Sequence, residues 1–175
     1  MKACILCPGP SLAEALRRPL REEYETVVGV NRAAEAFACD DWVALDVRTF
    51  GMTAPMGRPT IVTSLPHFRA MCREWPGARE YPHLDPRDVV PQSLRREWAT
   101  KGLLTAVAVA WARGADVIDC FGLDWEGEAD FDGRTFAGQK RTVERWQREA
   151  EQFARLAADL ARRGAAVTRV RPTPA

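Results

Sequence analysis

Short apolar runs alternate with segments of helical periodicity along most of the chain. The runs have the length and the β-branched content of strands buried on both faces. We expect strands at 4–7, 25–31, 41–46, 59–64, 117–121 and 166–170. Helical spacing of apolar residues predicts helices at 11–18, 33–38, 66–75, 100–113 and 139–163. This alternation predicts an α/β fold, with a mostly parallel sheet covered by helices on both faces.

Two stretches have no usable period. Residues 76–91 contain four prolines, which predict an irregular connection. Residues 125–138 are acidic and rich in glycine, and we interpret them as a mobile, solvated loop. Their acidic run resembles a calcium-binding loop only superficially, because Ala129 stands where an EF-hand needs glycine. In the long helix after this loop, Trp146 and Phe153 are expected on the apolar face that packs into the core.

Length and charge limit the functional classes. With 175 residues, 46% of them hydrophobic, residues 1–175 are expected to form a single domain with one sizeable core. A net charge of +1 gives no electrostatic reason to propose a nucleic-acid or membrane surface as partner. The apolar run at the N-terminus is too short for a signal peptide, and no segment has the length of a membrane span. We therefore expect a cytoplasmic location.

Cysteine and histidine usage argues against a metal centre built from these residues. The chain has five cysteines, and Cys4 and Cys7 form a Cys-x-x-Cys. Both lie in a predicted strand, where positions three apart face opposite sides, so redox or zinc chemistry is not expected there. The only histidines are His67 and His83, too few for a histidine-rich metal site.

The turn Pro8-Gly9-Pro10-Ser11 joins the first strand to the first helix. Ser11 and Glu14 have the spacing of a capping box, which predicts that the helix begins at Ser11 with free N–H groups over the strand end. Such a helix start attracts anions, although an ordinary cap explains the same spacing. The turn lacks the further glycines of a dinucleotide-binding loop and the Lys-Ser/Thr pair of a P-loop, which disfavours a dehydrogenase or a P-loop kinase.

Other polar and small residues follow the predicted strands. In a parallel sheet the carboxyl ends of the strands share one rim, and ligands bind there. The candidates at this rim are Asn31, Arg32, Asp46, Ser64, Gly122 and Asp124, together with Thr100, Lys101 and Gly102 at a helix start. Four of these residues have a second interpretation: Asn31 as a turn residue, Asp46 and Asp124 as caps, and Lys101 as a solvated side chain.

Taken in series, these motifs resemble the superfamily that joins the family 42 bacterial sialyltransferases with the 6-hydroxymethylpterin diphosphokinase MptE-like proteins. The series is Gly9-Pro10-Ser11-Leu12, Val28-Gly-Val-Asn31-Arg32, Asp46, Thr100-Lys-Gly102 and Phe121-Gly-Leu-Asp124. The resemblance implies a Rossmann-like sheet with a short lid at 125–142. It also implies contacts to a CMP-sugar from Gly9, Ser11, Asn31, Thr100, Gly102 and Asp124.

The sequence departs from that superfamily at two points. Lys101 replaces a serine, and no histidine follows His83, whereas the sialyltransferases carry a lid histidine as catalytic base. The diphosphokinase branch implies Mg-ATP and a metal-binding carboxylate, for which Asp46 is the candidate.

We therefore expect a nucleotide-binding transferase that resembles a glycosyltransferase, with a nucleotide-activated sugar as donor and a small molecule or glycan as acceptor. Two alternatives remain open: an Mg-ATP-dependent diphosphokinase, and a non-catalytic nucleotide-binding or interaction module. The expected catalytic residues are Asp46 and Lys101. The expected nucleotide-binding residues are Gly9, Pro10, Ser11, Asn31, Arg32, Ser64, Thr100, Lys101, Gly102, Gly122 and Asp124.

Overall fold

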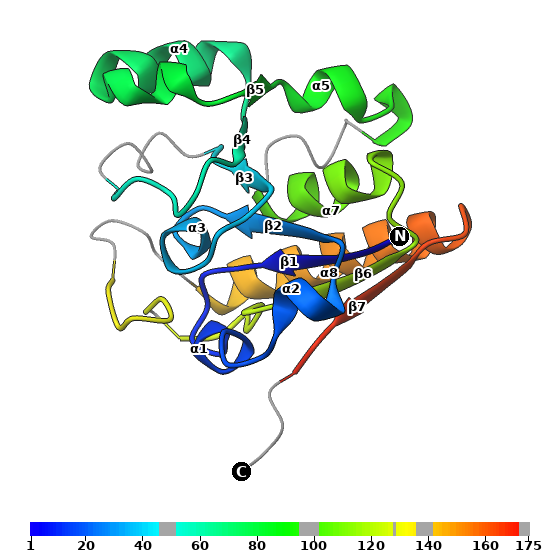
Figure 1. The fold of residues 1–175 in the computed structure, drawn as a ribbon. Coiled ribbons are helices and arrows are strands. Elements are labelled where there is room, and N and C mark those ends of the chain that lie inside the picture. Colours follow the sequence, from blue (N-terminus) through cyan, green and yellow to red (C-terminus); the bar gives the residue numbers. More distant parts are fainter. Residues whose placement is uncertain (46–51, 95–101, 128, 136–141, 172–175) are drawn as a thin grey trace.

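A computed structural model describes residues 1–45, 52–94, 102–127, 129–135 and 142–171. These residues form a seven-stranded sheet in the order β5-β4-β3-β2-β1-β6-β7 (Figure 1). Every neighbouring pair is parallel. The strands are β1 (Lys2–Leu6), β2 (Thr26–Val30), β3 (Asp41–Val43), β4 (Thr60–Val62), β5 (His83–Leu84), β6 (Val117–Phe121) and β7 (Ala166–Arg169). The predicted α/β class with a parallel, Rossmann-like sheet is confirmed.

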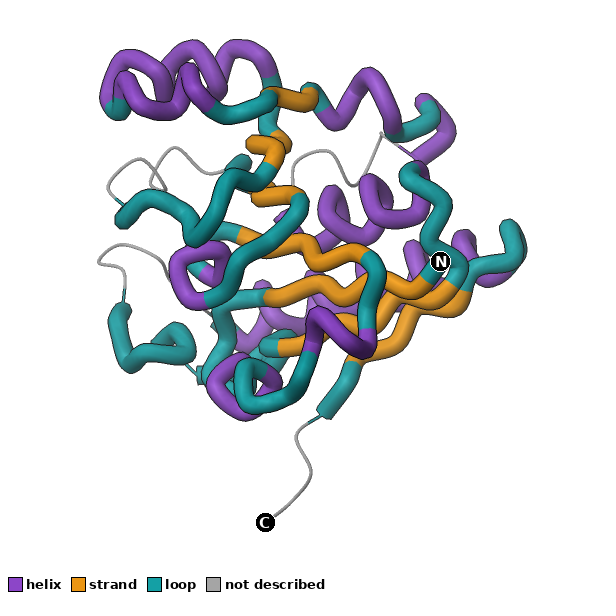
Figure 2. The backbone as a smooth tube through the Cα atoms, in the orientation of Figure 1, coloured by secondary structure: helices purple, strands orange, loops and turns teal. Residues whose placement is uncertain are grey.

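Helices cover both faces of the sheet (Figures 1 and 2). One face carries α5 (Pro86–Val89), α7 (Gly102–Ala112) and α8 (Val143–Ala161). The other carries α1 (Leu12–Ala15), α2 (Leu20–Glu23), α3 (Ala33–Ala36), α4 (Leu65–Glu74) and the 3₁₀ helix η2 (Pro76–Glu80). Each face has its own apolar core, and α7 is central to the first because its residues from Leu104 to Ala110 are all buried. A helix that is apolar all round must be buried in this way.

The order of the strands places a crevice beside β1. The chain moves outward from β1 through β2, β3 and β4 to β5, and then returns through α7 to β6 on the other side of β1. The connections that follow β1 and β6 therefore lead to helices on opposite faces of the sheet, α1 and α8. Such a switch point, at the carboxyl ends of the strands, is where open α/β sheets bind ligands.

The proline-rich stretch is more regular than expected. Within residues 76–91 the structure has η2, the edge strand β5 and α5. Pro76 and Pro86 each stand in the first turn of a helix, where proline costs no hydrogen bond and its fixed φ suits the helix. The prediction of an irregular connection was wrong because these prolines begin helices.

The cysteines behave as core residues. Cys4 belongs to the core on one face of the sheet and Cys7 to the core on the other, as the strand periodicity predicts. All five thiols are free and buried. Burial raises the pKa of the Cys39 thiol to about 12 and that of the Cys4 and Cys7 thiols further still. Buried thiols of this kind are inert.

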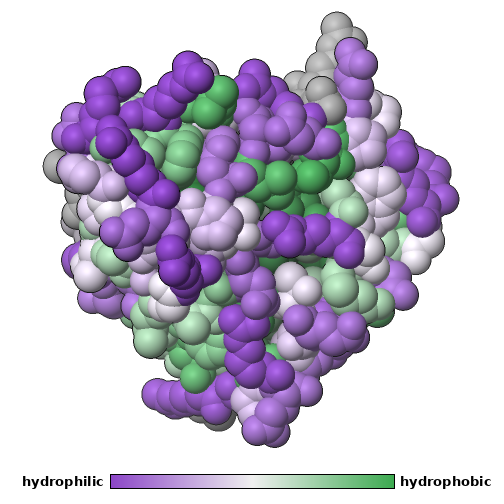
Figure 3. Space-filling view, turned by 45° about the horizontal axis from the view of Figure 1, so that its top comes forward, coloured by the Kyte–Doolittle hydropathy of each residue, from purple (hydrophilic) through white to green (hydrophobic). Residues whose placement is uncertain are grey.

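One face of the molecule is largely polar. On the face drawn in Figure 3, hydrophilic residues make up most of the surface and hydrophobic residues show mainly between them. In the part of the chain that the structure describes, no helix is long and apolar enough to cross a membrane.

Candidate functional site

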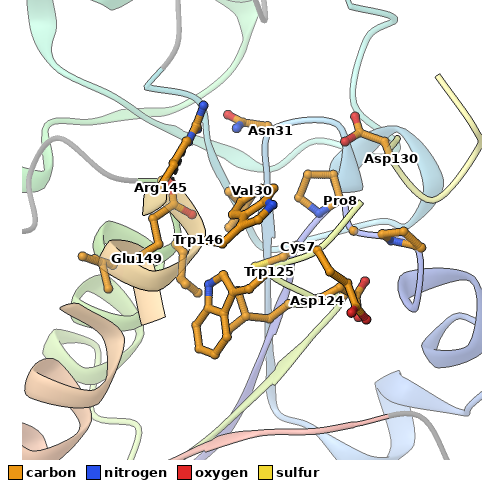
Figure 4. A pocket seen from close by; sticks show the side chains of 18 of the residues that line it. Cys7, Pro8, Val30, Asn31, Asp124, Trp125, Asp130, Arg145, Trp146 and Glu149 are labelled. Carbon is orange, nitrogen blue, oxygen red and sulfur yellow. Dashed lines mark hydrogen bonds and ion pairs between the residues drawn. The ribbon is translucent and has the colours of Figure 1, made fainter. Parts of the chain in front are cut away.

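A cavity of about 380 Å³ opens at the carboxyl ends of β1, β2 and β6 (Figure 4). Its walls come from the loops after these strands, from the start of α7 and from the start of α8. This position coincides with the switch point of the sheet. The volume lies within the roughly 300–1,000 Å³ of typical small-molecule pockets, toward the lower end.

Six of the predicted site residues line this cavity. They are Gly9, Pro10, Asn31, Gly102, Gly122 and Asp124. Three others, Ser11, Arg32 and Ser64, are not among its described lining residues. Asp46, Thr100 and Lys101 lie outside the described residues, as does part of the expected lid at 125–142.

The start of α1 is not a free anion site. The backbone N–H of Ser11 donates to Asp124 Oδ2 at 2.8 Å, and the N–H groups of Leu12 and Ala13 donate to the carbonyls of Gly9 and Pro10. The Ser11 side chain makes no capping bond, because its backbone is already helical at φ −70° and ψ −7°. The predictions of a capping box and of open N–H groups were therefore wrong, and a carboxylate of the protein itself lies at this helix start.

Gly9 is glycine because two loops meet there. A Cβ added to Gly9 would lie 2.4 Å from the carbonyl oxygen of Gly122 and 2.5 Å from Asp124 Oδ2. Gly122 itself has φ +66°, and a Cβ there would lie 2.0 Å from the carbonyl oxygen of Cys7. These contacts, with the hydrogen bond from Gly9 N–H to the Gly122 carbonyl at 3.0 Å, join the loops after β1 and β6 into one rigid wall.

Arg32 lies in a buried ion cluster and is not among the described lining residues of the cavity. Its side chain is 3% exposed and pairs with Asp130 at 2.9 Å, with Asp132 and with Glu35 at 3.6 Å. Asp130 is equally buried, so the interpretation of a solvated acidic loop is wrong for this residue. Phe131 N–H also donates to the Pro8 carbonyl at 2.9 Å, which fixes the acidic segment against the loop after β1.

Ser64 is also placed away from the cavity. It follows β4, three strands from β1 in the sheet, and its hydroxyl lies 3.1 Å from His67 Nδ1. The expectation that all strand ends contribute to one site fails here, because the sheet is wide and the cavity spans only its central strands.

Asn31 combines a turn conformation with a polar side chain in a residue that lines the cavity. Its φ of 48° is left-handed, which asparagine tolerates better than most residues. Its N–H donates to the Val43 carbonyl at 2.9 Å, and its carbonyl accepts from Trp42 Nε1 at 2.8 Å. Among the described residues, Asn31 Oδ1 is buried and has no hydrogen-bond partner. The backbone N–H and carbonyl of Asn31 are thus both hydrogen-bonded within the protein, whereas its side-chain oxygen is not bonded to any described residue.

The wall that α8 and the loop after β6 provide was not predicted from the sequence. This wall consists of Trp125, Arg145, Trp146 and Glu149 (Figure 4). Trp125 has a left-handed φ of 53°, stacks edge-on against Phe153 at 5.5 Å and lies 4.7 Å from the Arg169 guanidinium. Trp146 was expected in the core but lines the cavity. Helical periodicity could not separate these two roles, since both require an apolar face.

Trp125 also presents an unused donor. Its indole Nε1 is buried and has no hydrogen-bond partner within the described ranges. A tryptophan in a left-handed conformation is strained, and such strain gathers at functional sites. Asn31 and Trp125 both line the cavity, and each carries one buried polar atom, an acceptor on Asn31 and a donor on Trp125, that has no hydrogen-bond partner among the described residues.

The charges around the cavity are mainly acidic. The described lining contains Asp124, Glu126, Asp130 and Glu149 against one cation, Arg145. Asp130 pairs with Arg32, and Glu149 accepts from Arg145 Nε at 3.1 Å. Among the residues that the structure describes, no group of three or more His, Cys, Asp or Glu side chains is arranged to hold a metal ion.

Comparison with protein-family models and with curated proteins gives no match for this chain. The fold and the cavity are therefore the basis for assigning a function.

Proposed function

We propose that this cavity binds a nucleotide and that the protein is a transferase using a nucleotide-activated sugar. The observation that carries the proposal is the meeting of residues from three distant segments at one cavity. Gly9, Asn31 and Asp124 follow three different strands, and all three line it. Its position at the switch point of a parallel sheet is where this fold class binds nucleotides.

The unused polar groups suit a nucleobase. Asn31 Oδ1 can accept a hydrogen bond and Trp125 Nε1 can donate one, and both are buried without partners among the described residues. A base carries both kinds of group on its edge, and its flat face can stack on Trp125 or Trp146. Leaving buried polar groups unpaired costs about 1–3 kcal/mol each, so a ligand that pairs them is favoured by a similar amount.

The charges favour a donor with few phosphates. Arg145, which is partly exposed, and the start of α7 at Gly102 are the features of the described lining that favour an anion. Of the four carboxylates of the described lining, Asp130 and Glu149 are compensated by Arg32 and Arg145, whereas Asp124 and Glu126 add negative charge, so the several charges of ATP would be repelled more than the single phosphate of a CMP-sugar. This balance favours the glycosyltransferase interpretation over the diphosphokinase one.

The proposal is tested by binding measurements with CMP, UDP, GDP and ATP, each with and without Mg²⁺. We expect CMP to bind without a metal requirement and to raise the unfolding temperature. Binding of ATP alone, and only with Mg²⁺, would instead support the diphosphokinase. Absence of any nucleotide binding would refute the site, and nucleotide binding without turnover of any nucleotide-sugar would favour the non-catalytic module.

Asn31→Gly separates the two roles of Asn31. Glycine adopts φ 48° without strain, so the fold is expected to keep its stability while the side-chain oxygen is lost. We expect CMP affinity to fall about tenfold, as for one lost hydrogen bond in a buried site. A Ser64→Ala variant, changed at another strand end outside the cavity, is the matched control and should bind CMP like the original chain.

A further inference from the structure

A second hollow adjoins the first cavity at the start of α8. Its volume is about 370 Å³, and it shares Trp125, Glu126 and Trp146 with the first cavity. Its remaining wall comes from Gly127 and from three α8 residues that are not buried, Val143, Gln147 and Ala150. The two hollows are therefore neighbours that share three side chains.

The second hollow has an apolar floor and a polar edge. Two indole rings, Val143 and Ala150 provide the apolar surface, and Gln147 and Glu126 provide polar groups. Val143 is 66% exposed, an unusual place for a large aliphatic side chain at a helix start. A pyranose ring has one apolar face and a rim of hydroxyls, and it matches such a surface by stacking on an indole while its hydroxyls bond to the amide and the carboxylate.

Glu126 has a special position between the hollows. It lines both of them, whereas Gln147 lines only the second. A hydroxyl of a sugar in the second hollow and the anomeric carbon of a sugar-nucleotide in the first would meet at this boundary. A carboxylate at such a boundary can accept the hydroxyl proton during attack.

We propose that the second hollow binds the acceptor sugar and that Glu126 is the general base of the transfer. This inference rests on the proposed function for its chemical step. In that step the acceptor oxygen bonds to the anomeric carbon, and the bond from that carbon to the phosphate oxygen breaks with its electron pair leaving on the nucleoside phosphate. The hydroxyl proton passes to the Glu126 carboxylate.

Saturation-transfer NMR tests whether the second hollow binds a sugar, with the methyl glycosides of glucose, galactose, mannose and N-acetylglucosamine as ligands. At least one glycoside is expected to bind saturably. Ala150→Phe fills only the second hollow, so it should weaken that glycoside at least tenfold and leave CMP affinity within twofold. Gln147→Ala should weaken glycoside binding without disturbing the core, because Gln147 is exposed. Arg148→Ala is the control: Arg148 is exposed one position further along α8 and lines neither hollow, so glycoside and CMP affinity should stay unchanged.

The catalytic part is tested with Glu126→Gln, which keeps the shape of the side chain and removes its basicity. Release of CMP from a CMP-sugar, stimulated by the bound glycoside, should fall at least 100-fold, while both binding affinities stay within twofold. Release within threefold of the original rate would overturn the role of Glu126.

The two proposals fail in distinguishable ways. If CMP binds but no glycoside does, or if Ala150→Phe leaves glycoside affinity unchanged, the acceptor site is refuted and the nucleotide site stands. If a glycoside binds and depends on Ala150 while no nucleotide binds, the proposed transfer and the role of Glu126 are refuted and the sugar site stands.

Discussion

Replacing Arg32 with methionine tests the buried ion cluster that holds the acidic segment. Methionine keeps most of the aliphatic length beside Phe131 but removes the positive charge that faces Asp130, Asp132 and Glu35. Asp130 is 2% exposed and Glu35 is 8% exposed, so their carboxylates would remain buried without that cation. Removing one partner of a buried pair costs about 3–5 kcal/mol.

Urea unfolding followed by circular dichroism measures this loss at pH 7. A loss of 3–5 kcal/mol is a large part of the roughly 5–15 kcal/mol by which such domains are stable, and it corresponds to a fall of roughly 6–20 °C in Tm. Arg18→Met is the matched control, because Arg18 pairs with Glu23 at the surface, where such a pair is worth about 0–1 kcal/mol. If Arg32→Met costs no more than Arg18→Met, the cluster does not hold the segment.

Acid titration gives a second measurement on the same cluster. Hydrogen bonds from Arg32 hold the pKa of Asp132 well below its ordinary value of 3.8. The stability from this pair is therefore complete above about pH 4 and is lost as the pH falls further. Arg32→Met should reduce this acid-dependent loss, and an unchanged acid profile would contradict the pairing.

Three further predictions follow from other parts of the molecule. Burial raises the pKa of Asp41 from 3.8 to about 6 despite its 2.7 Å bond to Arg113, so stability should fall by up to about 3 kcal/mol as the pH rises from 4 to 6. Urea titrations at several pH values should show this fall, and Asp41→Asn should abolish it. If the stability of Asp41→Asn falls with pH as steeply as that of the original chain, the pKa shift of Asp41 is refuted. Gly9→Ala should lower the free energy of unfolding by about 1–3 kcal/mol and weaken CMP binding. Gly77→Ala should lower it less, because the Cβ added there would meet only a side chain at 3.0 Å. Equal losses of stability in calorimetry would contradict the tight junction at Gly9. All five thiols should resist a thiol reagent in the folded protein and react in denaturant, and rapid reaction of any thiol in the folded state would contradict its burial.

The site illustrates where sequence reasoning succeeds and where it fails. Gly9, Asn31 and Asp124 were predicted to lie at one edge of the sheet, and they line one cavity, because parallel strands bring their carboxyl ends together, a rule that needs only the order of strands and helices. Trp146 and Trp125 were missed, since an aromatic residue on a helix or in a loop looks the same whether it packs in a core or faces a ligand. The pairing of Arg32 with Asp130 and Asp132 was not predicted, because these two partners lie about a hundred residues away in the chain.

The sequence alone determined the fold class, because strand and helix periodicities are local and alternate along the chain. It also determined that Cys4 and Cys7 face opposite sides of the sheet, since successive residues of a strand alternate. Only the tertiary structure decided that Asp124 lies against Ser11, because that contact depends on how the loops after β1 and β6 meet. The same holds for the cavity beside Trp125 and Trp146, because packing between distant segments sets which side chains are left with unpaired polar groups and open space.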